Sequence, residues 1–163
     1  MNPAKKKAPV LRALKKSDLA RLEKWRGLGA HMLGYYLGKA AKPTPANLEK
    51  AFALWRDDFR SKVRNVDLAG ALGTLYGDIL VAKLDFDWRM RIDAHGEAYA
   101  LYSPFGWETY PIDYVWKRVA PKYLGEESGF FSGGWEFWLG KIPRRKQSRA
   151  RSVKPKKKPS RKR

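Results

Sequence analysis

The chain has 163 residues, of which 44% are apolar, and this is enough for the hydrophobic core of one domain of ordinary size. The lack of cysteine excludes disulfides, cysteine-ligated zinc and a thiol nucleophile, and the longest uncharged stretch of the first half, 27–38, is shorter than the roughly 20 apolar residues that span a bilayer. We therefore expect no transmembrane segment. A cytoplasmic location is also expected, because no apolar run of about 7 to 15 residues follows the basic N-terminus as it would in a signal peptide.

The net charge of +19 comes entirely from the two ends of the chain. Residues 17–140 contain 16 basic and 16 acidic side chains, whereas 1–16 contain six basic and 141–163 thirteen basic side chains, with no acid in either segment. Blocks of like charge repel one another and bury no apolar surface. The expected organisation is a basic N-terminal arm at 1–16, a single α+β globular domain at 17–140 and a disordered basic C-terminal tail at 141–163.

Three helices are expected in the first half of the domain. The first is capped by Ser17 or Asp18 and continues to about Ala40, and its glycines predict either a break near 27–29 or the close approach of another element. In the second, Thr44 is the N-cap and Pro45 occupies the first helical position, and the apolar stripe continues to Val63.

The third helix is expected to begin at a capping Asp67 and to contain three glycines in its interior. Together these glycines cost roughly 3 kcal/mol of helix propensity relative to alanine. No preceding strand and no following Gly-Lys-Ser/Thr accompanies them, so a phosphate-binding loop is not indicated. Another element must therefore pack closely against this helix. The three positions are Gly70, Gly73 and Gly77.

From Trp88 onward the hydrophobic period changes from helical to two, which indicates a half-buried strand. A turn at 93–96 with a glycine at its end predicts a hairpin, with a return strand at 97–103 and a third strand at 107–110. A short helix is expected after Pro111. The predicted fold is thus α+β, with the N-terminal helices packed on a small antiparallel sheet of about three strands and a short closing helix.

The segment 123–138 is rich in both glycine and aromatic residues. We expect a glycine-rich loop folded over the body, followed by a short extended piece at 135–139. Core filling or a partner interface is the favoured role of its aromatic side chains, because a small body needs them inside. The alternative is a stacking platform for unpaired bases. The residues concerned are Phe130, Phe131, Trp135 and Trp138.

A set of positions between 68 and 119 follows one recurring arrangement. It comprises Gly77-Asp78 inside the third helix, Trp88 opening the first predicted strand, Asp93 and Gly96 in the turn, Pro111 after the third strand, and Val115 with Lys117 and Arg118 in the last helix. With these features the stretch resembles the bacterial domain of unknown function DUF3806. The resemblance implies a compact module of helices and an antiparallel sheet, and it implies no catalytic residue, so these positions are expected to be structural.

Candidates for chemistry within the domain are few. Asp93 could orient His95 as a general base, but both are common turn residues and the structural interpretation is favoured, as it is for His31. Asp78 lies among apolar neighbours and needs a partner, for which Lys117 or Arg118 is expected. No histidine or carboxylate pair has ligand spacing, so neither an enzyme, a metal nor a cofactor is predicted.

The C-terminal tail is the strongest functional signal. Its cations are separated by proline, serine and alanine, as is typical of extended chains that neutralise phosphates without reading bases. The residues expected to contact DNA or RNA are Arg144, Arg145, Lys146, Arg149, Arg151, Lys154, Lys156, Lys157, Lys158, Arg161, Lys162 and Arg163.

We therefore expect a non-enzymatic protein associated with the nucleoid or a ribonucleoprotein, binding nucleic acid in a salt-sensitive way with little sequence specificity. The alternative is a module for a protein partner, such as an adaptor or a toxin-neutralising protein, whose tails only improve solubility or touch polyanions. Docking on anionic lipid and a nuclear import signal are further interpretations of the same charge run.

Overall fold

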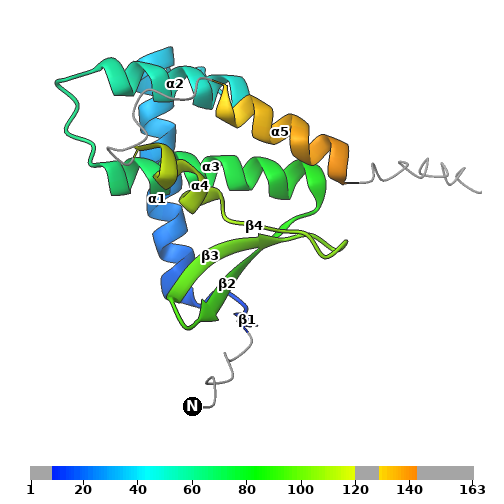
Figure 1. Cartoon of the computed structure of the whole chain (residues 1–163). Coiled ribbons are helices and arrows are strands. Elements are labelled where there is room, and N and C mark those ends of the chain that lie inside the picture. Colours follow the sequence, from blue (N-terminus) through cyan, green and yellow to red (C-terminus); the bar gives the residue numbers. More distant parts are fainter. Residues whose placement is uncertain (1–8, 120–128, 143–163) are drawn as a thin grey trace, which may run out of the picture.

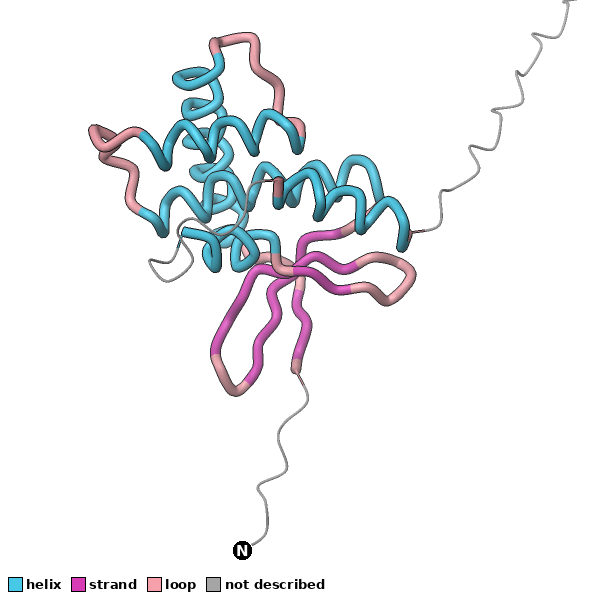
Figure 2. The backbone as a smooth tube through the Cα atoms, turned by 45° about the horizontal axis from the view of Figure 1, so that its top comes forward, coloured by secondary structure: helices cyan, strands magenta, loops and turns pink. Residues whose placement is uncertain are grey.

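The computed structural model describes residues 9–119 and 129–142, and within them five helices and one four-stranded antiparallel sheet confirm the predicted α+β class (Figure 1). The helix α3 runs through the middle, with α2 and α5 on one side of it and the sheet on the other (Figure 2). The elements are β1 (Val10–Arg12), α1 (Lys16–Leu37), α2 (Pro45–Asp57), α3 (Asn65–Leu84), β2 (Asp87–Asp93), β3 (Gly96–Tyr102), β4 (Glu108–Thr109), α4 (Pro111–Val119) and α5 (Phe130–Lys141).

Helix α1 is continuous through its glycines. Of the two predicted alternatives, a break near 27–29 or the close approach of another element, the structure has the close approach. A Cβ on Gly29 would lie 2.6 Å from a methyl group of Leu75, so the bare backbone lets α1 and α3 approach closely. The N-cap is Lys15 and not Ser17 or Asp18. Asp18 lies in the first turn instead, where its carboxylate accepts a hydrogen bond from the backbone N–H of Lys15 at 2.8 Å.

Helix α2 starts as predicted and ends earlier than predicted. Thr44 is the N-cap, and its hydroxyl accepts a hydrogen bond from the backbone N–H of Asn47 at 3.2 Å. The helix ends at Asp57 because the Asp58 carboxylate accepts a bond from the backbone N–H of Arg60, which favours a turn over another helical residue. The stripe therefore does not continue, and Phe59 is 90% exposed.

Helix α3 is buried on almost every side, and all three of its interior glycines have a close neighbour, as predicted. A Cβ on Gly70 would meet the ring of Trp25 at 2.2 Å, and one on Gly77 would meet the ring of Trp88 at the same distance. One on Gly73 would meet the Cα atom of Ile112 at 2.5 Å. The helix begins at Asn65, two residues before the predicted cap.

The sheet order is β1-β2-β3-β4, and the predicted hairpin between β2 and β3 is confirmed. Asp93 pairs with Gly96, whose φ of 122° is the positive value that favours glycine in this turn. The third predicted strand, β4, is shortened to Glu108–Thr109.

Strand β1 was not predicted, because three residues are too few for a visible alternation. It pairs with β2, so that Val10 lies opposite Ile92. The Arg12 side chain forms ion pairs with Asp18 at 2.5 Å and Glu97 at 3.2 Å. The prediction of an arm over the whole of 1–16 is therefore wrong from residue 10 onward, and Arg12 already has acidic partners. Residues 1–8 lie outside the described part.

Strand β1 is expected to lose its protection in acid before the core does. The hydrogen bond from Arg12 holds the pKa of Asp18 below its usual value, so the stability that this pair contributes is present above about pH 4 and is lost as the pH falls through the folded-state value. Hydrogen-exchange protection factors measured between pH 6 and pH 2 should fall first at 10–12 while α3 stays protected. An Asp18→Asn variant should show the same loss at pH 6, and undiminished protection there would contradict this assignment.

Helix α5 replaces the extended piece and the part of the predicted loop from residue 130 onward, whereas residues 123–128 of that prediction lie outside the described part. Gly129 provides a left-handed N-cap with φ of 86°, and the Glu49 carboxylate accepts a hydrogen bond from the Phe131 backbone N–H at 2.8 Å. A carboxylate at a helix N-terminus satisfies a free donor and favours the helix dipole.

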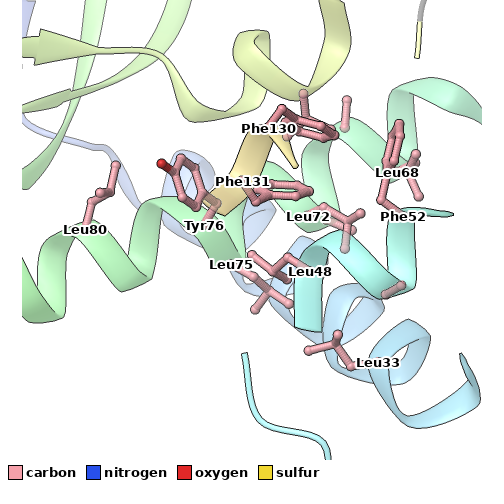
Figure 3. Packing of buried hydrophobic residues seen from close by; sticks show 14 of the residues in the cluster. Leu33, Leu48, Phe52, Leu68, Leu72, Leu75, Tyr76, Leu80, Phe130 and Phe131 are labelled. Atoms are coloured by element: carbon pink, nitrogen blue, oxygen red, sulfur yellow. The ribbon is translucent and has the colours of Figure 1, made fainter. Parts of the chain in front are cut away.

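The buried face of α5 adds to the core between α2, α3 and α4 (Figure 3). Phe131 is fully buried and Phe130 and Trp138 nearly so, which confirms core filling and rules out a stacking platform made of these three rings. No helix in the described ranges is long and apolar enough to cross a membrane.

Candidate functional site

The Asp78 carboxylate is the centre of a polar cluster that joins α1, α3 and β2. It accepts two hydrogen bonds from the Arg26 guanidinium, at 2.6 and 3.0 Å, and one from the Trp88 indole N–H at 3.0 Å. Bonding to Asp78 raises the pKa of Arg26 above its ordinary value. Gly77 has no side chain, so the Trp88 ring lies directly on α3. The bidentate Arg26–Asp78 pair and the Trp88 ring therefore both hold α3 in place, against α1 and β2 respectively.

The partner of Asp78 is therefore Arg26, and the prediction of Lys117 or Arg118 is wrong. Lys117 pairs with Asp113 one turn away on α4, at 3.6 Å. Arg118 lies over the ring of Tyr114 at 3.8 Å and donates to the backbone carbonyl of that residue at 2.7 Å. Sequence periodicity could not show the true partner, because Arg26 precedes Asp78 by 52 residues.

Two other positions of the DUF3806-like pattern also have structural contacts. Pro111 begins α4, and its carbonyl oxygen would lie 2.9 Å from a Cβ on Gly73. Asp93 accepts a hydrogen bond from the backbone N–H of His95 at 2.8 Å and lies 3.2 Å from the Arg91 guanidinium. His95 is exposed, and the Asp93 bond reaches its backbone, so this geometry is that of a turn and not of a general base oriented by a carboxylate.

No group of three or more histidine or acidic side chains that could hold a metal occurs in the part of the chain that the structure describes. The hollows on the described part of the chain include three with volumes of about 180, 280 and 340 Å³. The largest of these three is mainly apolar and lies between the start of α2, α3 and α5, with Asp78 and Trp135 in its wall. Trp135 is thus only partly exposed and lies beside aliphatic side chains.

An exposed aromatic surface that sequence reasoning missed lies at the end of α5. It consists of Trp107, Phe137 and Lys141, with the nearly buried ring of Trp138 between the two exposed rings. The Lys141 ammonium group lies 5.8 Å from the Trp107 ring centre and 5.7 Å from that of Phe137. We call these three residues the Trp107 surface. Its members come from a loop and a helix, so their proximity follows only from the fold.

The Trp107 surface adjoins the point where the described chain ends. Ile142 is buried, and its backbone N–H donates to the Trp138 carbonyl at 2.9 Å, so the described chain is held against the domain up to its last residue. The twelve cations predicted to contact nucleic acid, from Arg144 to Arg163, lie outside the described residues.

Comparison with known proteins gives a match to one family model and one similar solved structure. Residues 56–131 match the model of the family described as Domain of unknown function (DUF3806), a wider span than the 68–119 inferred from sequence. A crystal structure of a protein from Bacteroides thetaiotaomicron VPI-5482 aligns with a TM-score of 0.63 and 17% identity. The match covers 84% of this chain and 51% of that one, so this chain spans about half of that protein's length. No curated protein matches the chain.

Proposed function

We propose that this chain, whose residues 56–131 match the DUF3806 family, is a non-enzymatic protein that associates with nucleic acid through its basic C-terminal segment. The observation that carries the proposal is the division of charge: 141–163 hold thirteen cations and no acid, whereas 17–140 are balanced. A nucleoid or a ribonucleoprotein in a bacterial cytoplasm would supply such a polyanion.

The ion pairs within the folded domain support the assignment of phosphate binding to the C-terminal segment. The carboxylates of Asp18, Asp67, Asp78 and Glu108 each have an arginine partner within the described body. These four acids are therefore occupied by cations of the same domain. A segment of thirteen cations needs its counter-charge from another molecule, and phosphates at regular spacing provide it.

The chemistry of the segment favours binding without a sequence code. Lysine and arginine neutralise phosphates and release counterions, and this term is the same for every base sequence. Base edges are read by side chains held in a groove by a helix or a strand. The cations of this segment are separated by proline, serine and alanine, and no side-chain pattern in it is typical of base reading, so we expect affinity without strong sequence preference.

The test is a fluorescence-anisotropy titration of the complete chain against labelled 30-nucleotide DNA and RNA of mixed sequence, single-stranded and duplex. At 50 mM salt the proposal predicts binding at about micromolar concentration or tighter, with similar affinity for scrambled sequences. If none of the four probes binds at a protein concentration of 50 μM, the proposal is wrong.

The Trp107 surface is expected to add a preference for single strands. Unpaired bases can stack on exposed rings, and each stacked base is worth about 1–3 kcal/mol, whereas bases in a duplex are already stacked. The double variant Trp107→Ala with Phe137→Ala should bind the single strand about 10-fold more weakly and the duplex unchanged. Trp116→Ala is the matched control, because Trp116 is similarly exposed at 42% but lies on α4. Equal losses on both probes would contradict the stacking role.

A protein partner is the second candidate, favoured by one observation. Phe59 is 90% exposed on the loop after α2, and Tyr35, which is 71% exposed, lines a hollow with the neighbouring residues Asp58 and Arg60. Exposed aromatic side chains are enriched in protein interfaces. A single protein that co-purifies through nuclease and 1 M salt, and that is lost in a Phe59→Ser variant, would favour this candidate over nucleic acid.

A further inference from the structure

The hollow of about 280 Å³ lies between α3, β4, α4 and α5, away from the polar cluster of Asp78. Its wall includes the rings of Tyr76, Tyr114, Phe137 and Trp138. No charged side chain lines it, in contrast to the two other hollows, which contain Asp58 and Asp78 respectively. The environment is therefore aromatic and neutral.

The hydroxyl group of Tyr76 is an unsatisfied donor in this wall. Tyr76 is only 2% exposed, and within the described part of the chain its hydroxyl has no hydrogen-bond partner. The ring packs on Phe131 with a centroid distance of 5.4 Å, and the hydroxyl oxygen points away from that residue (Figure 3). Tyr114, which lies beside it, donates its own hydroxyl to the Phe130 carbonyl at 2.7 Å.

A buried hydroxyl without a partner costs free energy that phenylalanine at the same place would not. The ring packs on Phe131, and the hydroxyl oxygen packs against the backbone of Gly134, but within the described residues no acceptor or donor satisfies that oxygen. Burial also raises the pKa of Tyr76, so the phenol stays protonated and able to donate at neutral pH.

Two consecutive glycines of α5 form the opposite wall. A Cβ on Gly134 would lie 2.7 Å from the Tyr76 hydroxyl and 3.0 Å from that of Tyr114, so Gly134 is required by close packing. Gly133 has nothing within 4 Å of the place a Cβ would take. Packing therefore does not explain Gly133, and its missing side chain leaves the hollow open.

We propose that this hollow binds a small, neutral, planar molecule whose carbonyl oxygen or ring nitrogen accepts a hydrogen bond from the Tyr76 hydroxyl. The aromatic walls suit a flat ring, and the lack of lining charge disfavours ions. If a non-hydrogen atom takes roughly the 30 Å³ of a liquid water molecule, the hollow has room for about nine such atoms. This inference does not depend on the basic segment or on nucleic acid.

The test uses the complete ¹⁵N-labelled chain and three neutral probes, benzamide, nicotinamide and uracil, with toluene as a control that lacks an acceptor. At least one probe should shift the amide signals of 76, 133 and 134 with saturation in the millimolar range, and toluene should bind more weakly. If none of the three probes shifts these signals at 20 mM, the proposal is overturned.

Two variants separate ligand binding from folding. Tyr76→Phe should weaken the best probe at least 5-fold without lowering the melting temperature, because it removes only the unpaired hydroxyl. Gly133→Leu should abolish binding and leave the chain folded, because Gly133 lines the hollow and its Cβ meets no neighbour. Unchanged affinity in both variants would overturn the assignment even if the probe binds the chain elsewhere.

Discussion

Ending the chain at Ile142 is expected to weaken its binding to a labelled 30-nucleotide single strand by about 100-fold or more at 0.1 M salt. The truncation removes twelve cations and no acid, and each phosphate contact contributes counterion release to the binding free energy. Ile142 is the right last residue because it is buried against the body, and Lys141 remains on the Trp107 surface. Anisotropy titrations of the two chains side by side measure the ratio.

A full-length variant with the same twelve cations changed to glutamine is the matched control. It keeps the length of the segment and removes only its charge. We expect it to bind as weakly as the truncated chain, while the far-ultraviolet circular dichroism of the body stays unchanged. Retention of the original affinity by either variant would show that the body, and not the segment, holds the nucleic acid.

Replacing Gly73 with alanine is expected to have the largest effect on stability, about 3 kcal/mol of destabilisation. The new Cβ would lie 2.5 Å from the Cα atom of Ile112 and 2.9 Å from its backbone nitrogen. Backbone atoms cannot turn aside as the end of a side chain can, so α4 would have to move away from α3. The free energy of unfolding from urea titration measures the loss.

Gly27→Ala is the matched control for this substitution. Gly27 also lies inside a helix, α1, but a Cβ there meets nothing within 4 Å. The alanine should therefore stabilise the chain by about 1 kcal/mol, since it carries only the gain in helix propensity. The same substitution is thus expected to have opposite signs at 27 and 73, and equal effects would mean that α3 and α4 do not touch as described.

Structure encoded by neighbouring residues was predictable from the sequence. The Thr44-Pro45 start of α2 and the turn ending at Gly96 each depend on a few adjacent side chains, and both are confirmed. The close packing of α3 was predictable as well. Glycines inside a helix lower its propensity, and only a neighbouring element that needs the space offsets this cost.

Features that depend on distant residues were missed. Helix α5 begins where it does because Glu49, 82 residues earlier, binds the Phe131 backbone N–H, and its own glycines pointed to a loop. Strand β1 exists because it pairs with β2 about 80 residues later. The predicted partner of Asp78 was wrong for the same reason. The periodicity of apolar residues carries no information about contacts between distant parts of the fold.

The candidate functional features also differ in whether the sequence alone could show them. The charge of the C-terminal segment is a property of composition and needs no fold, so it was visible in the sequence. The Trp107 surface and the hollow beside Tyr76 are made of side chains from different elements, and only the structure brings them together. The burial of Phe130, Phe131 and Trp138 agrees with the favoured role of core filling and excludes the stacking alternative for these three rings.

The salt dependence of binding tests the central claim most directly. For the complete chain on single-stranded nucleic acid, the logarithm of the association constant should fall with the logarithm of the salt concentration with a slope of about −5 or steeper, since each phosphate contact adds about −0.7. For the chain ending at Ile142 the slope should be shallower than about −2. Equal slopes for the two chains would contradict the assignment of phosphate binding to the basic segment.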